Sequence, residues 1–211
     1  MSLPFDPGPT QQSGAPSPAQ RRAGLRQVVR TFRSRLTEEV REAQTAQAVN
    51  RLLGVLDAAR RDLPEELRGS PVIALSMPID GELDVTSLAG ALRSGGWTVT
   101  LPVVVDDQSM DFREWTGTED LARGRYRVLE PLDGQVLEPH IVVVPCVAVD
   151  QHGTRLGFGK GFYDRALASA DRPVAIGAVF DEQVVADVPR EDWDVPLDVV
   201  VTPSTVIYPP S

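Results

Sequence analysis

The sequence contains very little cysteine, histidine or lysine. Its 211 residues include one cysteine, two histidines and one lysine, Lys160. The lone cysteine, Cys146, excludes an internal disulfide framework, and its apolar neighbours predict a buried thiol in a reducing compartment. The histidines, His140 and His152, have no cysteine or histidine partner at metal-binding spacing, so no zinc site is expected. We therefore predict a cytoplasmic protein.

Long apolar runs and excess positive charge are also absent. No apolar stretch approaches the roughly 20 residues that span a bilayer, so no membrane partner is expected. The formal net charge of −9 disfavours nucleic acid as a partner, because that would need a broad basic surface. The expected ligands are small molecules, and an anionic one would need positive charge concentrated at its site.

The apolar pattern indicates a single α/β domain. Residues 1–19 are rich in proline, glutamine, serine and glycine, which predicts a disordered tail before one domain at residues 20–211. Helical spacing runs from Gln20 to about Arg61 in two segments. Residues 106–139 have no steady period and predict a long excursion with room for a hairpin. Further helices are expected at 85–96 and 162–170, and strands at 71–77, 97–105, 140–150, 172–180 and 197–203. Their alternation predicts a mainly parallel sheet covered on both faces.

The stretch RLGFGKGFYDR, residues 155–165, follows the most strand-like segment and enters a predicted helix. In open α/β sheets, ligands bind where strands end in such loops. Glycines at alternate positions would let backbone N–H groups approach an anion, while Lys160 and Arg155 would neutralise phosphate oxygens. The spacing matches neither a Walker A loop nor a dinucleotide-binding fingerprint. A tight strand-to-helix turn without a ligand is the alternative.

Two carboxylates near this loop are candidates for a metal site. Asp164 follows the loop directly, and Asp194 lies in the segment REDWDVPLD. Mg²⁺ takes one or two carboxylates together with phosphate oxygens. The alternatives are a helix-capping role for Asp164 and an ordinary loop position for Asp194.

A basic stripe occurs at helical spacing near the start of the chain. It comprises Arg22, Arg26, Arg30 and Arg33. Such a stripe can bind an anion, and its alternative is a solvated helix face. No G-x-S-x-G or cysteine–histidine signature accompanies it, so a nucleophilic hydrolase is not expected.

The run DQHGTRLGFGKGFYDRAL resembles the signature of 5-formyltetrahydrofolate cyclo-ligases, also called 5,10-methenyltetrahydrofolate synthetases. The likeness covers about residues 20–207 and continues through RAGLR, DGELD, LPVV, MDFREW, LEP, VPCVAVD and VPREDWDVPLDVVVTP. It implies a three-layer α/β/α fold related to sugar-phosphate isomerases and CoA transferases. It also implies ATP- and Mg²⁺-dependent conversion of 5-formyltetrahydrofolate to 5,10-methenyltetrahydrofolate, with release of ADP and phosphate. We expect the protein to act as a monomer.

The resemblance also assigns roles to individual residues. Lys160, Arg155 and Tyr163 would take part in catalysis, and Asp164 and Asp194 would hold Mg²⁺. The nucleotide would contact Arg22, Arg26, Arg155, Leu156, Gly157, Phe158, Gly159, Lys160, Gly161, Phe162 and Tyr163. The folate would contact Leu75, Glu82, Met110, Phe112, Tyr126, Phe158, Gly159, Lys160, Gly161 and Phe162. In the family's mechanism the formyl oxygen takes the γ-phosphate, N10 attacks the activated carbon, and phosphate leaves.

Three positions depart from the family pattern. Arg22 stands where lysine is frequent, Phe158 where some relatives have arginine, and SMPIDGELD is one residue longer before Glu82. One rival interpretation is a non-catalytic paralogue that binds ATP or folate. Such paralogues usually lose the Tyr-Asp pair or the second acid, all of which are kept here. An isomerase or transferase on the same fold is a second rival, but it does not predict the glycine run.

Overall fold

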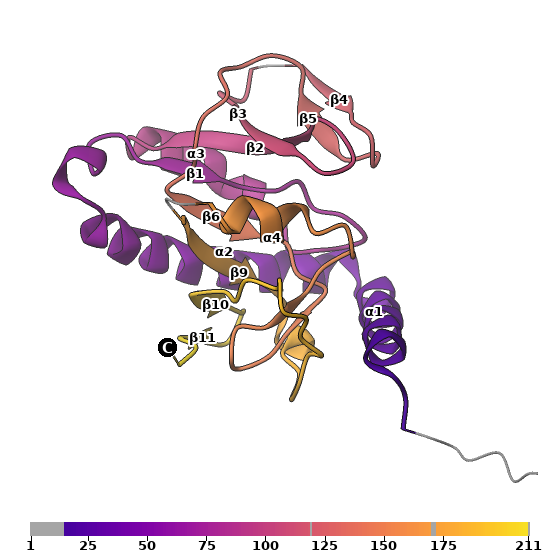
Figure 1. The fold of residues 1–211 in the computed structure, drawn as a ribbon. Helices are drawn as coiled ribbons and strands as arrows, with labels where there is room; N and C mark the ends of the chain where they lie inside the picture. The colour runs from indigo at the N-terminus through magenta and orange to yellow at the C-terminus, as the bar shows by residue number, and fades with distance from the viewer. Residues whose placement is uncertain (1–14, 119, 170–171, 211) are drawn as a thin grey trace, which may run out of the picture.

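A seven-stranded sheet forms the centre of the structure, a computed structural model that describes residues 15–118, 120–169 and 172–210 (Figure 1). Its strands are β1 (Val72–Ala74), β2 (Thr98–Val104), β3 (Met110–Glu114), β6 (Ile141–Val144), β9 (Val174–Ala178), β10 (Val199–Val201) and β11 (Val206–Ile207). They lie in the order β11-β10-β9-β6-β1-β2-β3. The five inner strands are parallel, and the edge strands β3 and β11 are antiparallel to their neighbours. This confirms the predicted mainly parallel sheet.

Helices cover both faces of the sheet. They are α1 (Pro18–Arg35), α2 (Glu38–Asp62), α3 (Ala89–Ser94) and α4 (Phe162–Leu167), with short 3₁₀ helices η1 (Glu65–Leu67), η2 (Val85–Leu88) and η3 (Asp181–Gln183). Leu56 of α2 and Leu92 of α3 are buried in one apolar cluster with alternate strand residues such as Ile141. Leu167 of α4 packs in a second cluster with residues such as Val142 on the opposite face. The two clusters give the predicted three-layer α/β/α arrangement (Figure 1).

Helix α1 lies beside the sheet and not on either face (Figure 1). Its Val29 packs on Ala148 and Leu156, which belong to a small two-stranded ribbon. Ser17 caps the helix, because its side chain accepts a hydrogen bond from the backbone N–H of Gln20. Pro18 follows at the first helical position, where its lack of a backbone N–H costs no helical hydrogen bond. Helix α1, which carries the basic stripe, therefore lies next to the loops that follow the strands of the sheet.

One strand prediction needs correction. The segment 140–150 does not form one strand, because β6 ends before Pro145, which has no N–H for the ladder. The chain then enters β7 (Ala148–Val149), which pairs with β8 (Arg155–Leu156) in the separate ribbon. The excursion 106–139 contains the expected hairpin, formed by β4 (Leu121–Arg123) and β5 (Leu129–Pro131), and in addition the edge strand β3.

The remaining expectations concern the tail, the thiol and the membrane. Residues 1–14 of the predicted tail lie outside the described residues, and its last two, Pro18 and Ala19, belong to α1. Cys146 is buried as expected, and burial raises the pKa of its thiol to about 12. Within the described part of the chain, no helix is long and apolar enough to cross a membrane.

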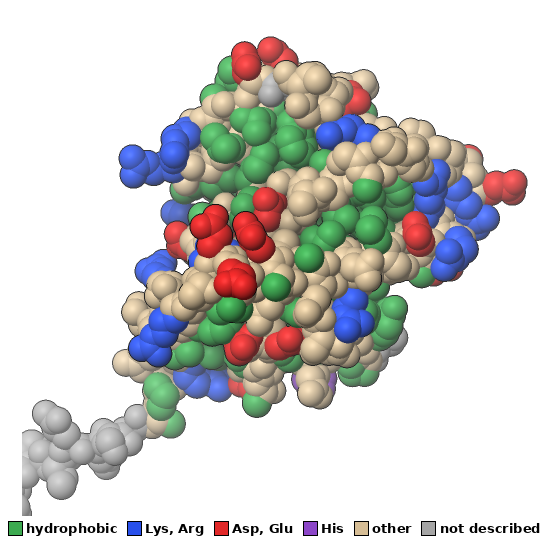
Figure 2. Space-filling model, turned by 180° about the vertical axis from the view of Figure 1, so that it is seen from behind, with side chains coloured by type: hydrophobic (Ala, Val, Ile, Leu, Met, Phe, Trp, Pro, Cys, Tyr) green, Lys and Arg blue, Asp and Glu red, His purple; other side chains and the backbone are tan. Residues whose placement is uncertain are grey.

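Charge on the surface is mixed. The face turned away from the viewer in Figure 1 carries acidic side chains near its middle and basic ones toward its edges (Figure 2). On that face the described basic side chains are not gathered in one continuous patch (Figure 2).

Candidate active site

A cavity of about 790 Å³ opens where strands β1, β2 and β6 end. Its lining falls into two parts that differ in chemistry. What we call the polar half is lined by Arg22, Arg26, Arg155, Asp164, Glu191, Trp193 and Asp194. The apolar half is lined by Met77, Ile79, Pro102, Val104, Met110, Tyr126, Val128 and Phe162. The glycine loop, residues 157–161, joins the two halves.

The glycine loop is held by the ribbon that precedes it. Asp150 is buried, and its carboxylate accepts hydrogen bonds from the backbone N–H groups of His152, Thr154 and Val188 at 2.9, 3.0 and 3.1 Å. Gly159 has a φ of 90°, a conformation that an L side chain rarely adopts. The following helix α4 has only six residues, so its dipole is small and the cations supply most of the positive charge.

Two of the arginines are fixed by carboxylates. Arg155 is buried and donates to the Asp164 carboxylate and to the carbonyl of Val195. Arg22 lies 3.3 Å from a Glu191 oxygen and 3.5 Å from an Asp194 oxygen. The Arg22 contacts join α1 to the loop before β10, and the Arg155 contact with Val195 joins the ribbon to that same loop, so these contacts also fix the position of α1 and of the loop.

Arg26 and Lys160 are held differently. Arg26 donates from Nε to the carbonyl of Gly157 at 3.0 Å, and burial together with the nearby Arg22 charge lowers its pKa. Lys160 is exposed, with Nζ 5.2 Å from the ring centroid of Tyr126. Among the described residues, neither makes an ion pair with a carboxylate. Both are therefore available to an anion on the glycine loop.

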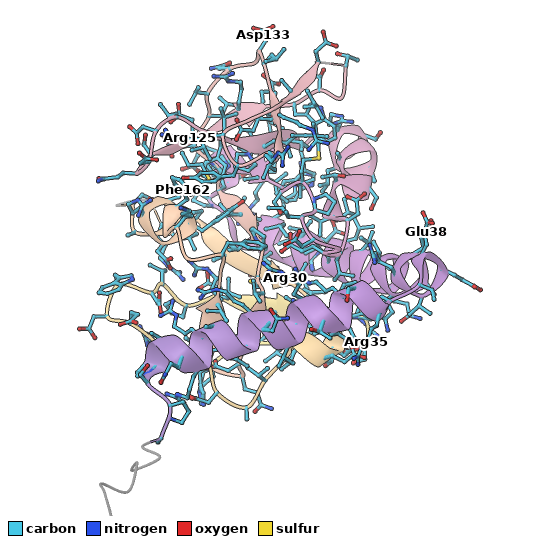
Figure 3. All side chains as sticks on the ribbon, turned by 90° about the vertical axis from the view of Figure 1, so that its right-hand side faces the viewer. Arg30, Arg35, Glu38, Arg125, Asp133 and Phe162 are labelled. Carbon is cyan, nitrogen blue, oxygen red and sulfur yellow. The ribbon has the colours of Figure 1, made fainter. Side chains whose placement is uncertain are left out.

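The apolar half is walled by strands and by the β4–β5 hairpin. Val104 of β2 is paired with Met110 of β3, and both side chains line the cavity. Tyr126 at the hairpin turn contacts Phe162 of α4, with ring centroids 5.7 Å apart. Figure 3 labels Phe162 of α4 and, next to Tyr126 in the hairpin turn, Arg125. The turn thus reaches across the cavity to the end of the glycine loop.

One carboxylate lies within this apolar wall. Glu130 of β5 is 9% exposed and accepts a hydrogen bond from the backbone N–H of Val104 at 3.3 Å. Burial raises its pKa. The bond ties the hairpin to the sheet, so the wall does not depend on apolar contact alone.

Most of the predicted site residues meet in this cavity. The lining includes Arg22, Arg26, Met110, Tyr126, Arg155, Gly157, Phe158, Gly159, Lys160, Gly161, Phe162, Tyr163, Asp164 and Asp194. Four others do not line it. Leu75, Phe112 and Leu156 are buried in the apolar clusters, and Glu82 lies in a small adjoining cavity.

Glu82 faces Arg33 in the interior. Both side chains are buried, and the two Arg33 terminal nitrogens lie 3.4 Å from one Glu82 oxygen. The other oxygen accepts from the backbone N–H of Ile79 at 3.2 Å. Burial raises the pKa of Glu82 to about 7, and the Arg33 charge opposes that rise. Its small cavity shares Ser76 and Pro145 with the main one, so Glu82 lies just behind the site.

The solvated-face alternative for the basic stripe is wrong for three of its four arginines. Arg22 and Arg26 line the cavity, and Arg33 is buried. Only Arg30 is largely exposed, with a long 3.8 Å ion pair to Asp80 (Figure 3). The four-residue repeat was visible in the sequence, but the side that packs against the protein was not.

Several lining residues were not predicted. Glu130, Glu191 and Trp193 are the most informative, because each is a charged or aromatic group in the lining. Trp193 directly precedes Asp194. An aromatic residue next to a candidate metal ligand in a polar loop could have indicated that Trp193 belongs to the site. No local feature of the sequence marked Glu130.

The two predicted metal ligands end near one another. Asp164 accepts from the backbone N–H of Val195, the neighbour of Asp194, at 3.3 Å. Among the described residues there is no group of three or more histidine, cysteine or acidic side chains arranged to hold a metal alone. Two carboxylates fit Mg²⁺ bound jointly by protein and phosphate, because that ion usually keeps phosphate and water ligands. The donor set therefore fits a nucleotide-bound Mg²⁺.

A glycine loop and available cations at the ends of parallel strands are typical of α/β proteins that bind a phosphorylated small molecule. Comparison with known proteins narrows this class. A sequence model described as the 5-formyltetrahydrofolate cyclo-ligase family matches residues 18–203. The chain belongs to that family.

Individual relatives agree over nearly their whole length. The chain is 32% identical to the 5-formyltetrahydrofolate cyclo-ligase of Escherichia coli (strain K12), over 85% of this chain and 98% of that one. It is 30% identical to the enzyme of the same name from Haemophilus influenzae, over 86% and 98%. The NMR structure of Aquifex aeolicus 5,10-methenyltetrahydrofolate synthetase superposes with a TM-score of 0.70 at 31% identity, covering 89% of this chain and 92% of that chain.

Proposed function

We propose that the protein converts 5-formyltetrahydrofolate to 5,10-methenyltetrahydrofolate, using ATP and Mg²⁺ and releasing ADP and phosphate. The observation that carries the proposal is the continuity of the two halves of one cavity through the glycine loop. A polar half with available cations suits a triphosphate, and an apolar half with aromatic rings suits a pterin. A reaction between the two substrates needs both at one place.

The proposed chemistry has two steps. The formyl oxygen attacks the γ-phosphorus of ATP, and the bond to ADP breaks. N10 then attacks the activated carbon and loses its proton, and phosphate leaves with the former formyl oxygen. Phosphoryl transfer requires positioning and charge neutralisation more than a covalent nucleophile. The lining supplies backbone N–H groups and cations, which meet that requirement.

The polar residues divide into those that meet phosphate and those that position them. Lys160 and Arg26 have no carboxylate partner among the described residues, so they neutralise phosphate oxygens. Arg155 already donates to Asp164 and Val195, and it therefore acts chiefly by positioning Asp164. Burial raises the pKa of Tyr163, so its phenol stays protonated and serves as a hydrogen-bond donor.

Asp164 and Asp194 would hold Mg²⁺ at the phosphates. The ion would supply positive charge that stabilises the transferring phosphoryl group. Changing either residue to asparagine should therefore raise the Mg²⁺ concentration needed for half-maximal activity. Asp192→Asn is the matched control, because Asp192 is an exposed neighbour that does not line the cavity.

The folate would occupy the apolar half, against Met110 and Tyr126. Leu75 and Phe112 would act from the core by supporting that wall. Glu82, just behind the cavity, is proposed to hydrogen-bond the pterin. A cytoplasmic location and a monomeric state stay predictions from the sequence.

The deciding experiment mixes purified protein with (6S)-5-formyltetrahydrofolate, ATP and Mg²⁺ and follows methenyltetrahydrofolate by its near-ultraviolet absorbance. We expect a rise that disappears when ATP or the metal is omitted. A flat trace from folded protein that still binds ATP would contradict the enzyme and favour the non-catalytic paralogue. The Asp164→Ala variant serves as the inactive reference, since it removes both the proposed metal ligand and the partner of Arg155.

A further inference from the structure

Trp193 is exposed inside the cavity lining. It keeps 67% of its surface accessible, whereas Trp97 is 6% exposed and Trp115 is partly buried beneath the Arg93 guanidinium. A tryptophan ring normally buries a large apolar area, so leaving it open forgoes stabilisation. A tryptophan left open within a cavity has a flat face available to a ligand.

The loop that carries Trp193 is well fixed. The backbone N–H of Asp194 donates to the Glu191 carbonyl at 3.1 Å, and the N–H of Glu191 donates to the Asp194 carboxylate at 2.8 Å. Arg22 then contacts both acids. These bonds anchor the backbone on both sides of Trp193, so its ring is carried at the polar half by a preorganised turn.

A second exposed aromatic ring lines the same cavity. Phe158 of the glycine loop is 40% exposed. The polar half and the adjoining glycine loop therefore combine cations that suit phosphates with two exposed aromatic rings that suit an uncharged group. The molecule that needs both is a nucleotide, whose charged phosphates are joined to a flat uncharged base.

We propose that Trp193 stacks on the base of the bound nucleotide, with Phe158 as a second aromatic contact. The proposal rests on the proposed function, because it takes ATP as the co-substrate. Trp193 is adjacent to groups that serve the phosphates, and the apolar half has its own rings in Tyr126 and Phe162. Those positions assign Trp193 to the base and not to the pterin.

The test compares ligands with and without a base. Calorimetry measures binding of ATP and of inorganic tripolyphosphate, both with Mg²⁺, to the wild type, Trp193→Ala and Trp193→Phe. Stacking predicts that Trp193→Ala weakens ATP binding by about tenfold or more and leaves tripolyphosphate binding unchanged. Trp193→Phe keeps a ring and should stay within about threefold of the wild type for ATP. Asp192→Asn, which alters an exposed neighbour, should bind both ligands as the wild type does.

Fluorescence gives an independent signature. ATP should quench the tryptophan emission of the wild type, and this quenching should vanish in Trp193→Phe while calorimetry still detects binding. Quenching that persists in that variant would contradict stacking on Trp193.

Other outcomes would overturn the proposal in distinguishable ways. Equal weakening of ATP and tripolyphosphate in Trp193→Ala would mean that the residue only supports Asp194 and Arg22. Unchanged ATP affinity together with weaker 5-formyltetrahydrofolate binding would assign the ring to the pterin. Failure of the wild type to bind ATP at all would instead defeat the proposed function, and this inference with it.

Discussion

The polar half of the cavity and its apolar half differ in how their side chains are held. In the polar half, Arg22 is held by carboxylates from a distant part of the chain, and Arg155 is held by the nearby Asp164 carboxylate. In the apolar half, Val104 and Met110 lie opposite one another on paired strands. Ion pairs need correct geometry to offset desolvation, whereas strand pairing places side chains by register. Changes in the polar half should therefore affect chemistry and nucleotide binding, and changes in the apolar half should affect folate binding alone.

Lys160 lies between the two halves, and its removal should have the largest effect. Lys160→Ala removes an available cation from the glycine loop and should lower kcat by about a thousandfold. Because the side chain is exposed, the melting temperature should hardly change. Steady-state kinetics and thermal unfolding of the same preparations check both statements. Lys160→Arg is the charge-retaining control, and full activity of Lys160→Ala would defeat the site assignment.

Glu82 lies just behind the two halves, and besides its proposed hydrogen bond to the pterin it should affect stability. Because burial raises its pKa from the ordinary 4.5 to about 7, the folded protein holds this proton more tightly than the unfolded chain does. The resulting stabilisation is complete below pH 4.5 and is lost as the pH rises through about 7. At about 1.4 kcal/mol per pKa unit, the loss is on the order of 3 kcal/mol.

Glu82→Gln lacks this titration. In urea unfolding between about pH 5 and about pH 8, its unfolding free energy minus that of the wild type should increase with pH. Parallel profiles for the two proteins would show that Glu82 titrates at its ordinary pKa in the folded state.

Two arginines of α1 test the polar half with a matched pair. Arg22 lines the cavity, whereas Arg30 is largely exposed on the same helix. Arg22→Ala should raise the KM for ATP by about tenfold, since a charge-assisted contact is lost. Arg30→Ala should leave that KM within about twofold. Equal effects of the two substitutions would indicate that the helix acts through its net charge and not through placed contacts.

The smallest expected effect concerns the apolar wall. Met110→Ala removes apolar contact area and should raise the KM for 5-formyltetrahydrofolate by about fivefold, while the KM for ATP stays unchanged. Leu132→Ala is the control, because Leu132 is exposed and does not line the cavity. A parallel rise in both KM values would mean that the two halves are not separable.

Local patterns in the sequence predicted much of the fold. Apolar spacing indicated the helices that became α1 and α2, and β-branched runs indicated the parallel strands. The break at Pro145 and the pairing of β3 with β2 were not predicted. The break at Pro145 depends on the ribbon that β7 forms with β8. The pairing of β3 with β2 was missed because the irregular apolar spacing of 106–139 did not indicate a strand at β3.

The candidate site was predictable where its residues lie close together in the sequence. The run from Arg155 to Asp164 carried its own signal, because glycines, cations and an acid occur within ten positions. Leu75 and Phe112 were expected to meet the folate, but they lie in the core. Alternation along a strand indicates two faces without showing which one meets the cavity, so these positions could not be separated from lining ones.

Local pattern in the sequence predicted the glycine loop and a mainly parallel sheet covered on both faces, and the resemblance to a known family implied the three-layer fold. The folded structure was needed to show which arginines of α1 turn inward, that Glu82 is buried against Arg33, and that Trp193 is exposed in the cavity. Those outcomes depend on which distant segments pack together: Arg33 and Glu82 are 49 residues apart, and Arg22 and Asp194 are 172 apart. Whether a side chain is buried or paired depends on contacts between distant segments, so the local sequence around that residue cannot predict it.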